Sequence, residues 1–176
     1  MLSNKMTEAL NEQIALEGNS SAAYLSIASW CETQGLSGCA SFFYDQSSEE
    51  RMHMMKIIHY INEMDGHAII PAQEKPRDNY GTIQEVFDIV YQQEKKVTNA
   101  IYNLIAISNE DKDHSTNLFL QWYVAEQREE EAMVRTILDT IKLIGNGPQS
   151  LYYIDKEVEK INQQKEAEEA GAELNA

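Results

Sequence analysis

Four long stretches of the chain place apolar residues three and four positions apart, the spacing that lines one face of an α-helix. These apolar seams run over residues 10–31, 39–64, 83–104 and 120–144. Each seam is interrupted near its middle by residues of the kind that ligate metals, namely Glu17, Glu50 and His53, Glu94, and Gln127 and Glu130. The pattern predicts an all-α protein in which four helices each turn a polar group toward a shared core.

Capping residues set the ends of the first two helices. Ser3 or Asn4 can cap a first helix that runs to residues 33–35, and Ser37 can cap a second that runs to residues 65–66. Because the connection between the two helices is tight, we expect them to form an antiparallel hairpin.

Similar signals delimit the third and fourth helices. Residues 82–85 form a capping box at the start of the third helix, which fades near residues 108–109. Asp111 or Asp113 then caps the fourth helix, which is expected to stop at residues 145–147.

A fifth helix is expected to be short. Pro148 suits its first turn, and we expect it to end near Ile161. With 176 residues, the chain is long enough for one domain with a substantial core. The predicted organisation is a four-helix bundle with the metal centre in residues 1–145, a fifth helix in 146–162 and a flexible tail in 163–176.

One long connection separates the second helix from the third. Residues 67–81, which include Pro71 and Pro76, could span about 50 Å when extended, whereas a helix of about 27 residues is about 40 Å long. The connection can therefore cross the whole bundle, which would make the second and third helices parallel.

The interrupting carboxylates need a source of positive charge, because an ionised carboxylate alone in an apolar core is very costly. No Lys or Arg lies on any of the four seams, so a bound metal cation is the simplest remaining source. The net charge of −15 also favours cations as partners and argues against nucleic acid and against an anionic membrane surface.

Counting residues from the turns places the interrupting groups at one height. Glu17 and His53 both lie about 22 to 26 Å from the turn that joins their helices. Glu94, Gln127 and Glu130 lie at a similar depth in the second hairpin. The four helices are thus predicted to deliver Glu17, Glu50, His53, Glu94, Gln127 and Glu130 to one layer.

Four carboxylates and one imidazole in a single layer suit iron or manganese, and the lack of thiolate ligands argues against a structural zinc site. Glu50 and His53 lie one turn apart on the same helical face. We predict that Glu17, Glu50 and His53 hold one ion. Glu50 would bridge to a second ion, held also by Glu94 and Glu130, with Gln127 close by.

Further acidic residues flank this predicted pair of ions. Glu126 precedes Glu130 by one turn and Glu49 adjoins Glu50, so these residues form either a solvated surface or a third, more exposed cation site. Tyr24 lies on the same face as Glu17, where it could simply pack, donate a hydrogen bond to a ligand, or take part in electron transfer.

The lengths of the apolar runs and the number of cysteines indicate where in the cell the protein is located. No run approaches the length of a membrane span, and the first residues lack a basic segment followed by an apolar core. Cys31 and Cys39 are the only cysteines, a number that fits a reduced compartment, and we expect Cys31 to pack as a small apolar residue. A cytoplasmic location is predicted.

The chain resembles the bacterial non-haem ferritins. The positions that carry the resemblance are Glu17, Tyr24, Glu50, His53, Glu94, Gln127 and Glu130. The resemblance covers the four helices, the crossover and the fifth helix. It implies a shell of twenty-four subunits that oxidises ferrous iron at a dinuclear centre, with oxygen or hydrogen peroxide as oxidant, and stores the ferric mineral inside. It also implies a third iron site at the positions of Glu49, Glu126, Glu129 and Glu130.

Neighbouring families differ at informative positions. Bacterioferritins and rubrerythrins carry Glu-x-x-His on two helices, whereas the fourth helix here offers Gln127 and Glu130. The residue after the predicted bridging glutamate is Arg51 rather than a haem-ligating methionine, so no haem is expected. Rubrerythrins also have a four-cysteine iron module, for which two cysteines are too few.

The sequence is also compatible with two alternative functions. The first is a di-iron or dimanganese oxidoreductase that acts on peroxide or a small substrate and forms no shell. The second is a helical interaction module whose buried acids pair with polar neighbours and bind no metal.

Overall fold

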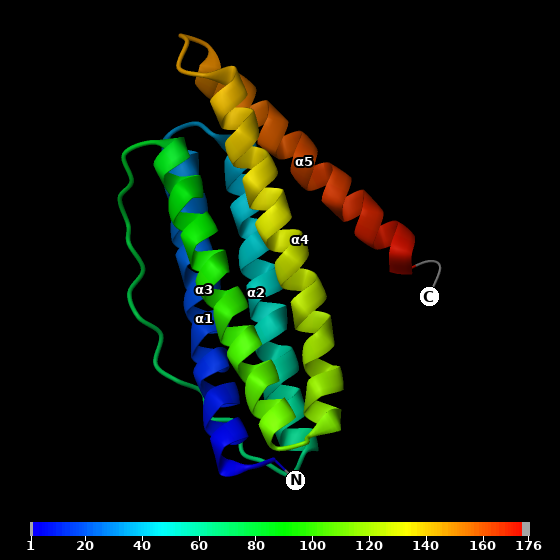
Figure 1. Cartoon of the computed structure of the whole chain (residues 1–176). Coiled ribbons are helices and arrows are strands. Elements are labelled where there is room, and N and C mark those ends of the chain that lie inside the picture. The colour runs from blue at the N-terminus through cyan, green and yellow to red at the C-terminus, as the bar shows by residue number, and fades with distance from the viewer. Residues whose placement is uncertain (1, 174–176) are drawn as a thin grey trace.

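Five helices and their connections make up the part of the chain described by the computed structural model, residues 2–173. The helices are α1 (Asn4–Thr33), α2 (Ser37–Glu63), α3 (Ile83–Glu110), α4 (His114–Ile144) and α5 (Ser150–Glu173). As Figure 1 shows, α1 to α4 form a bundle in which α2 and α3 run in the same direction. The prediction of an all-α, four-helix bundle with one long crossover is confirmed. Within residues 2–173, no helix is long and apolar enough to cross a membrane.

Side-chain caps begin three of the four bundle helices as predicted. The hydroxyl of Ser3 accepts from the backbone N–H of Met6 at 3.1 Å, and that of Thr82 accepts from Glu85 at 3.1 Å. Of the two candidates for α4, Asp113 is the cap. These caps satisfy N–H groups that have no partner within the helix itself.

The cap predicted for α2 is wrong. Ser37 is already the first helical residue, and Leu36 before it makes no side-chain cap. The carboxylate of Asp155, which belongs to α5, instead accepts from the backbone N–H of Cys39 at 2.8 Å. A residue more than a hundred positions away thus replaces the local cap.

This contact between α2 and α5 depends on Gly38. A Cβ atom at position 38 would lie 2.3 Å from the backbone oxygen of Asp155 and 2.8 Å from the Cβ of Glu159. The missing side chain therefore allows the two helices to approach closely enough for the Asp155 cap to form.

We expect Gly38→Ala to destabilise the docking of α5. The clash involves backbone, which cannot rotate away, so the expected loss is about 1–3 kcal/mol of unfolding free energy. Urea denaturation should show it, with Gly147→Ala as a matched control because the nearest atom to an added Cβ there is 3.5 Å away. Equal stability of the two variants would contradict the close contact.

The bundle core consists of two apolar clusters. One contains Tyr24, Phe43, Phe87 and Ile137 and extends to the start of α5, and the other contains Leu10, Ile57, Ile101 and Leu120. Between them, every bundle helix contributes buried polar side chains. The core is thus an apolar half, a polar layer and a second apolar half, stacked along the bundle axis.

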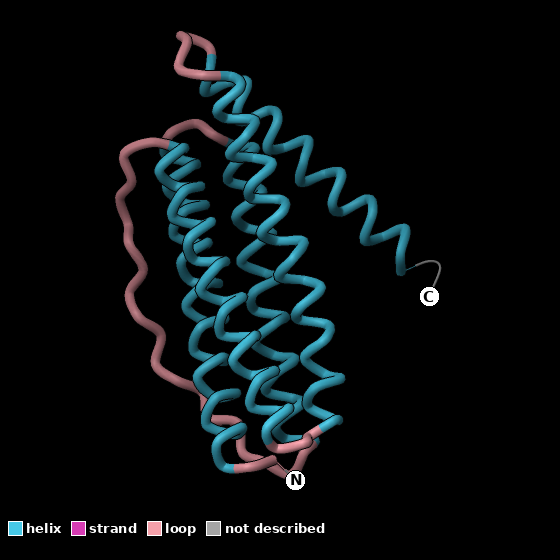
Figure 2. The backbone as a smooth tube through the Cα atoms, in the orientation of Figure 1, coloured by secondary structure: helices cyan, strands magenta, loops and turns pink. Residues whose placement is uncertain are grey.

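The crossover runs along the outside of the bundle from one end to the other, as Figure 2 shows. Three side chains of α1 hold it: Asn11 accepts from the N–H of Ile69 at 2.7 Å, and Asn19 accepts from the N–H of Glu74 at 3.1 Å. The hydroxyl of Ser26 donates to the carbonyl of Arg77 at 2.6 Å. Because these three residues are spaced by about two helical turns, they form one polar stripe that follows the crossover.

The fifth helix is longer than the sequence indicated. It continues to Glu173 rather than ending near Ile161, so residues 163–173 are helical; the last part of the predicted tail, residues 174–176, lies outside the described residues. The extension is rich in Glu, Lys, Gln and Ala, which have high helix propensity. Tertiary contacts reinforce it, since the amide of Asn162 donates to Asp45 of α2 at 2.6 Å.

Candidate metal centre

The six residues that interrupt the apolar seams all lie in the polar layer. Each is at most 4% exposed, and together they come from all four bundle helices: Glu17, Glu50, His53, Glu94, Gln127 and Glu130. Burial of four carboxylates in one layer is unfavourable unless something compensates their charge. The four carboxylates therefore need hydrogen-bond donors, cations or protons as partners.

Three of these residues form a tight group. Glu17, Glu50 and His53 each offer a ligand atom, and these atoms all lie within 4.8 Å of one another. On α2, the Nδ1 atom of His53 is 3.5 Å from the Oε2 atom of Glu50. One imidazole and two carboxylates converging from two helices can enclose a cation.

Three buried carboxylate oxygens of the polar layer have no hydrogen-bond partner. They are Oε2 of Glu17, Oε2 of Glu50 and Oε2 of Glu130. The other oxygen of Glu17 accepts from the amide of Gln13 at 2.8 Å. Since each unsatisfied buried acceptor carries a desolvation cost, three of them in one layer indicate a binding site for a cation.

Glu94 is held from two sides. The hydroxyl of Tyr24 on α1 donates a short hydrogen bond to its Oε1 atom, and the amide of Gln127 on α4 donates to its Oε2 atom at 3.1 Å. Glu94 and Glu130 lie outside the tight group, but after burial the charge of each also raises the pKa of Glu50. Gln127 turns its nitrogen toward Glu94, so it orients that carboxylate here.

Protonation follows from this crowding. Burial, and then the charge of Glu50, raises the pKa of Glu17 well above its usual range. Burial, and then the charge of Glu94, does the same for Glu50. These raised pKa values favour the protonated carboxyl groups when the layer holds no metal, and a cation that binds there competes with the protons.

Comparisons with known proteins show the family of the chain. The family model described as a ferritin-like domain matches residues 7–144. A bacterial non-haem ferritin of Campylobacter jejuni is 41% identical over 92% of this chain and 96% of its own length. The chain belongs to the ferritin family. A probable non-haem ferritin-like protein of Haemophilus influenzae is 40% identical over 92% of this chain and 98% of its own. An open-pore ferritin of Archaeoglobus fulgidus has a TM-score of 0.87 at 40% identity, covering 90% of this chain and 98% of that one.

In this ferritin the residues predicted for a third site are not all gathered. Glu129 is exposed and lies beside Arg128, 3.8 Å away. Glu126 is half-buried, and burial raises its pKa. Glu49 accepts from the amide of Gln46 at 2.7 Å and also contacts a lysine.

That lysine is Lys165 of α5. The four seams contain no Lys or Arg, but this residue of the fifth helix brings a positive charge to the polar layer. Its Nζ atom is 2.9 Å from Oε1 of Glu130, so one of the four buried carboxylates does have a basic partner. Among the ion pairs of residues 2–173, none joins a Lys or Arg to Glu17, Glu50 or Glu94.

No role was predicted from the sequence for three residues around the centre, although Gln46 lies on the second seam. Gln13 and Gln46 each lie one turn before a seam carboxylate, and that spacing could have revealed them. Lys165 lies beyond the predicted end of the fifth helix. The spacing of three and four that links Ile154, Val158, Ile161 and Lys165 was its signal.

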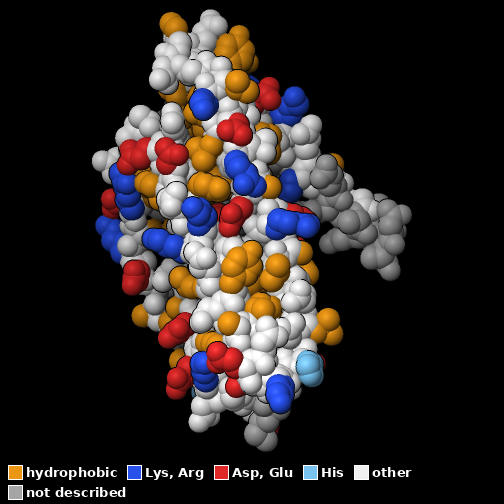
Figure 3. Space-filling view, in the orientation of Figure 1, with side chains coloured by type: hydrophobic (Ala, Val, Ile, Leu, Met, Phe, Trp, Pro, Cys, Tyr) orange, Lys and Arg blue, Asp and Glu red, His pale blue; other side chains and the backbone are white. Residues whose placement is uncertain are grey.

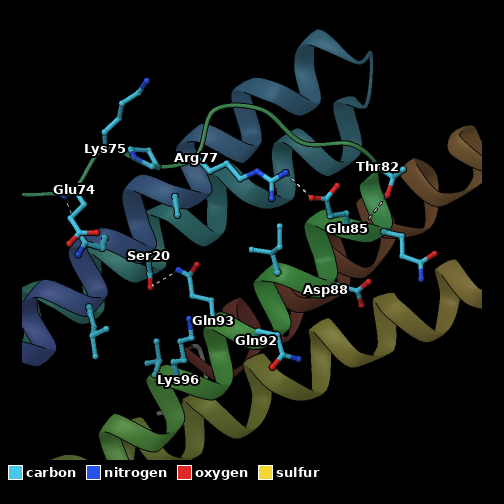
Figure 4. A pocket seen from close by; sticks show the side chains of 17 residues that line it. Ser20, Glu74, Lys75, Arg77, Thr82, Glu85, Asp88, Gln92, Gln93 and Lys96 are labelled. Carbon is cyan, nitrogen blue, oxygen red and sulfur yellow. Dashed lines mark hydrogen bonds and ion pairs between the residues drawn. The ribbon is translucent and has the colours of Figure 1, made fainter.

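A large pocket of this ferritin lies away from the predicted ligands. It is an open space of about 900 Å³ between the crossover, α1 and α3, and none of the predicted ligands lines it (Figure 4). Arg77 pairs with Glu85 at 2.7 Å along it, and the amide of Gln93 donates to the hydroxyl of Ser20 at 2.8 Å. A second pocket, of about 450 Å³, has Glu129, Glu130 and Lys165 in its lining, so the candidate metal centre is bordered by a different space from this one.

Proposed function

We propose that this ferritin oxidises ferrous iron at a dinuclear centre in the polar layer and stores the ferric product as a mineral inside a shell of twenty-four subunits. The observation that carries the proposal is the set of three unpartnered, buried carboxylate oxygens from three helices, on Glu17, Glu50 and Glu130. Two of these residues, Glu17 and Glu50, form the tight group with the imidazole of His53. Membership of the ferritin family supports it, because the relatives match over nearly their whole lengths.

Iron is the substrate, and the ligands divide between two ions. Glu17, Glu50 and His53 would hold the first, and Glu50 would bridge to a second. Glu94 and Glu130 would complete the second position, where Tyr24 and Gln127 orient Glu94. Two ferrous ions supply the two electrons that reduce dioxygen to hydrogen peroxide, or peroxide to water.

The anionic ligands favour this direction of reaction. Carboxylates stabilise the ferric ion more than the ferrous ion because its charge is higher. Their protons, retained by the raised pKa values of Glu17 and Glu50, leave as iron binds. The chain itself thus supplies charge compensation, proton release and fixed geometry.

Assembly is the second part of the proposal. Leu151, Tyr152 and Tyr153 are more than half exposed at the start of α5, and Leu143 at the end of α4 is 87% exposed. Figure 3 shows other hydrophobic side chains among the charged ones over α3 and α4. Contacts between subunits would cover such surface. We also propose a cytoplasmic location, for which the two buried free thiols, Cys31 and Cys39, are the support.

Aerobic loading with ferrous salt, followed by gel filtration and electron microscopy, tests the function. Twenty-four chains of 20.1 kDa would elute at about 480 kDa and show an electron-dense mineral within a hollow particle. A monomer or dimer that still oxidises iron would favour the oxidoreductase without a shell. Absence of any ferrous-dependent absorbance would favour the interaction module.

We expect Tyr24→Phe to weaken the second metal position. Phenylalanine preserves the ring in the core but removes the hydrogen bond that holds Glu94, and loss of such a supporting bond costs about 10–100-fold in metal affinity. Anaerobic titration with Co(II), followed by visible absorbance, measures it. Tyr60→Phe is the control, because that hydroxyl bonds Thr116 in the apolar half away from the layer. Equal affinities in the two variants would show that Tyr24 only packs.

A further inference from the structure

Lys165 lies between two acidic residues beside the metal centre. Its Nζ atom is 2.5 Å from Oε2 of Glu49 and 2.9 Å from Oε1 of Glu130, and its side chain is only 21% exposed. A lysine is ordinarily protonated near neutral pH, and two carboxylates at these distances favour its charged form. The side chain is therefore an ammonium cation held by two carboxylates.

The fifth helix fixes this lysine in place through contacts with α2. Asp155 caps the N-terminus of α2, Asn162 bonds Asp45, and Lys165 pairs with Glu49. These contacts occur in the same order along both helices, and Ile154 and Val158 are buried in the apolar cluster that also contains Cys39 and Phe43 of α2. Lys165 is thus positioned by a docked helix rather than by a freely moving tail.

A metal ion could not share this position with the lysine. An ion bound to both Glu49 and Glu130 would lie about 2.0–2.2 Å from each oxygen, which is nearly the place of Nζ. The two cations would also repel each other strongly at such a separation. One carboxylate pair therefore holds either the ammonium group or the metal.

We propose that the ammonium group of Lys165 occupies the third cation position next to the dinuclear centre, so that this chain binds two divalent ions and not three. The inference rests on the proposed dinuclear function and refines it. Lys165 contacts Oε1 of Glu130 and leaves Oε2 unpartnered. The lysine thereby fills the outer position while it orients Glu130 toward the inner one.

Metal stoichiometry tests the proposal. Zn(II) binding to the assembled full-length protein, measured by calorimetry and by elemental analysis after gel filtration, needs no oxidation. We expect two ions per chain in the unsubstituted protein and in Lys165→Arg, which keeps the charge. Lys165→Met, which keeps the chain length but removes the charge, should bind three.

Lys160→Met is the matched control, because Lys160 is on the same helix, is 61% exposed and pairs only loosely with Glu157 at 3.7 Å. It should bind two ions. Three ions in the unsubstituted protein would overturn the inference, and so would two in Lys165→Met with density for α5 still docked in its crystal structure. No ion at all in the unsubstituted protein would instead overturn the dinuclear centre.

Discussion

Glu50→Ala is expected to abolish rapid oxidation of ferrous iron, with a loss of about 100-fold or more in initial rate. The reason is its central position, because Glu50 belongs to the tight group with Glu17 and His53 and lies next to Glu94 and Glu130. Without this carboxylate neither ion keeps its full ligand set. Stopped-flow absorbance after mixing with ferrous salt and oxygen measures the rate.

His53→Ala should behave similarly, since it removes the only imidazole of the group. Glu63→Ala is a control on the same helix, because that glutamate is exposed at the end of α2. Gel filtration of all three variants should show an unchanged particle, which separates loss of chemistry from loss of assembly. An unchanged oxidation rate in Glu50→Ala and His53→Ala would refute the assignment of the centre.

The metal-free protein is expected to lose stability as pH rises above the ordinary pKa of a glutamate, which is about 4.3. Glu17 and Glu50 have pKa values raised by burial, so the folded state retains protons that the unfolded state releases above its own, ordinary pKa. Stability falls with pH wherever the folded state binds more protons, by up to about 1.4 kcal/mol per pH unit for each such group. Urea midpoints of the metal-free protein at several pH values measure this.

Glu17→Gln provides the matched comparison, because it removes one titrating group with little change in shape. Its stability should depend less on pH than that of the unsubstituted protein. Bound metal should remove the effect, since the cation replaces the retained protons. A metal-free protein whose stability rises over this pH range would contradict the proposed protonation of the layer.

The sequence was sufficient for the features that depend on local pattern. Apolar residues spaced three and four positions apart correctly predicted the four bundle helices. Capping residues such as Thr82 and Asp113 correctly predicted where α3 and α4 begin. The length of the crossover gave the parallel arrangement of α2 and α3. Residue counts from the turns placed Glu17 and His53 at one height, and both lie in the polar layer.

Features that depend on distant partners were not predictable in this way. Ser37 is a good local cap, but Asp155 takes that role because Gly38 lets α5 approach. The amide orientation of Gln127 depends on Glu94, a residue of another helix. The ion pairs of Lys165 were not predicted because its acidic partners lie on α2 and α4, far from it in the sequence. Local spacing shows which face is buried, but not which partner meets it.

The most direct measurement is an anomalous-scattering map from a crystal soaked with ferrous salt without oxygen and recorded at the iron absorption edge. The account predicts two peaks per chain in the polar layer, one beside Glu17 and His53 and one beside Glu94 and Glu130, with Glu50 between them. An empty layer, or iron bound only at exposed carboxylates, would contradict it.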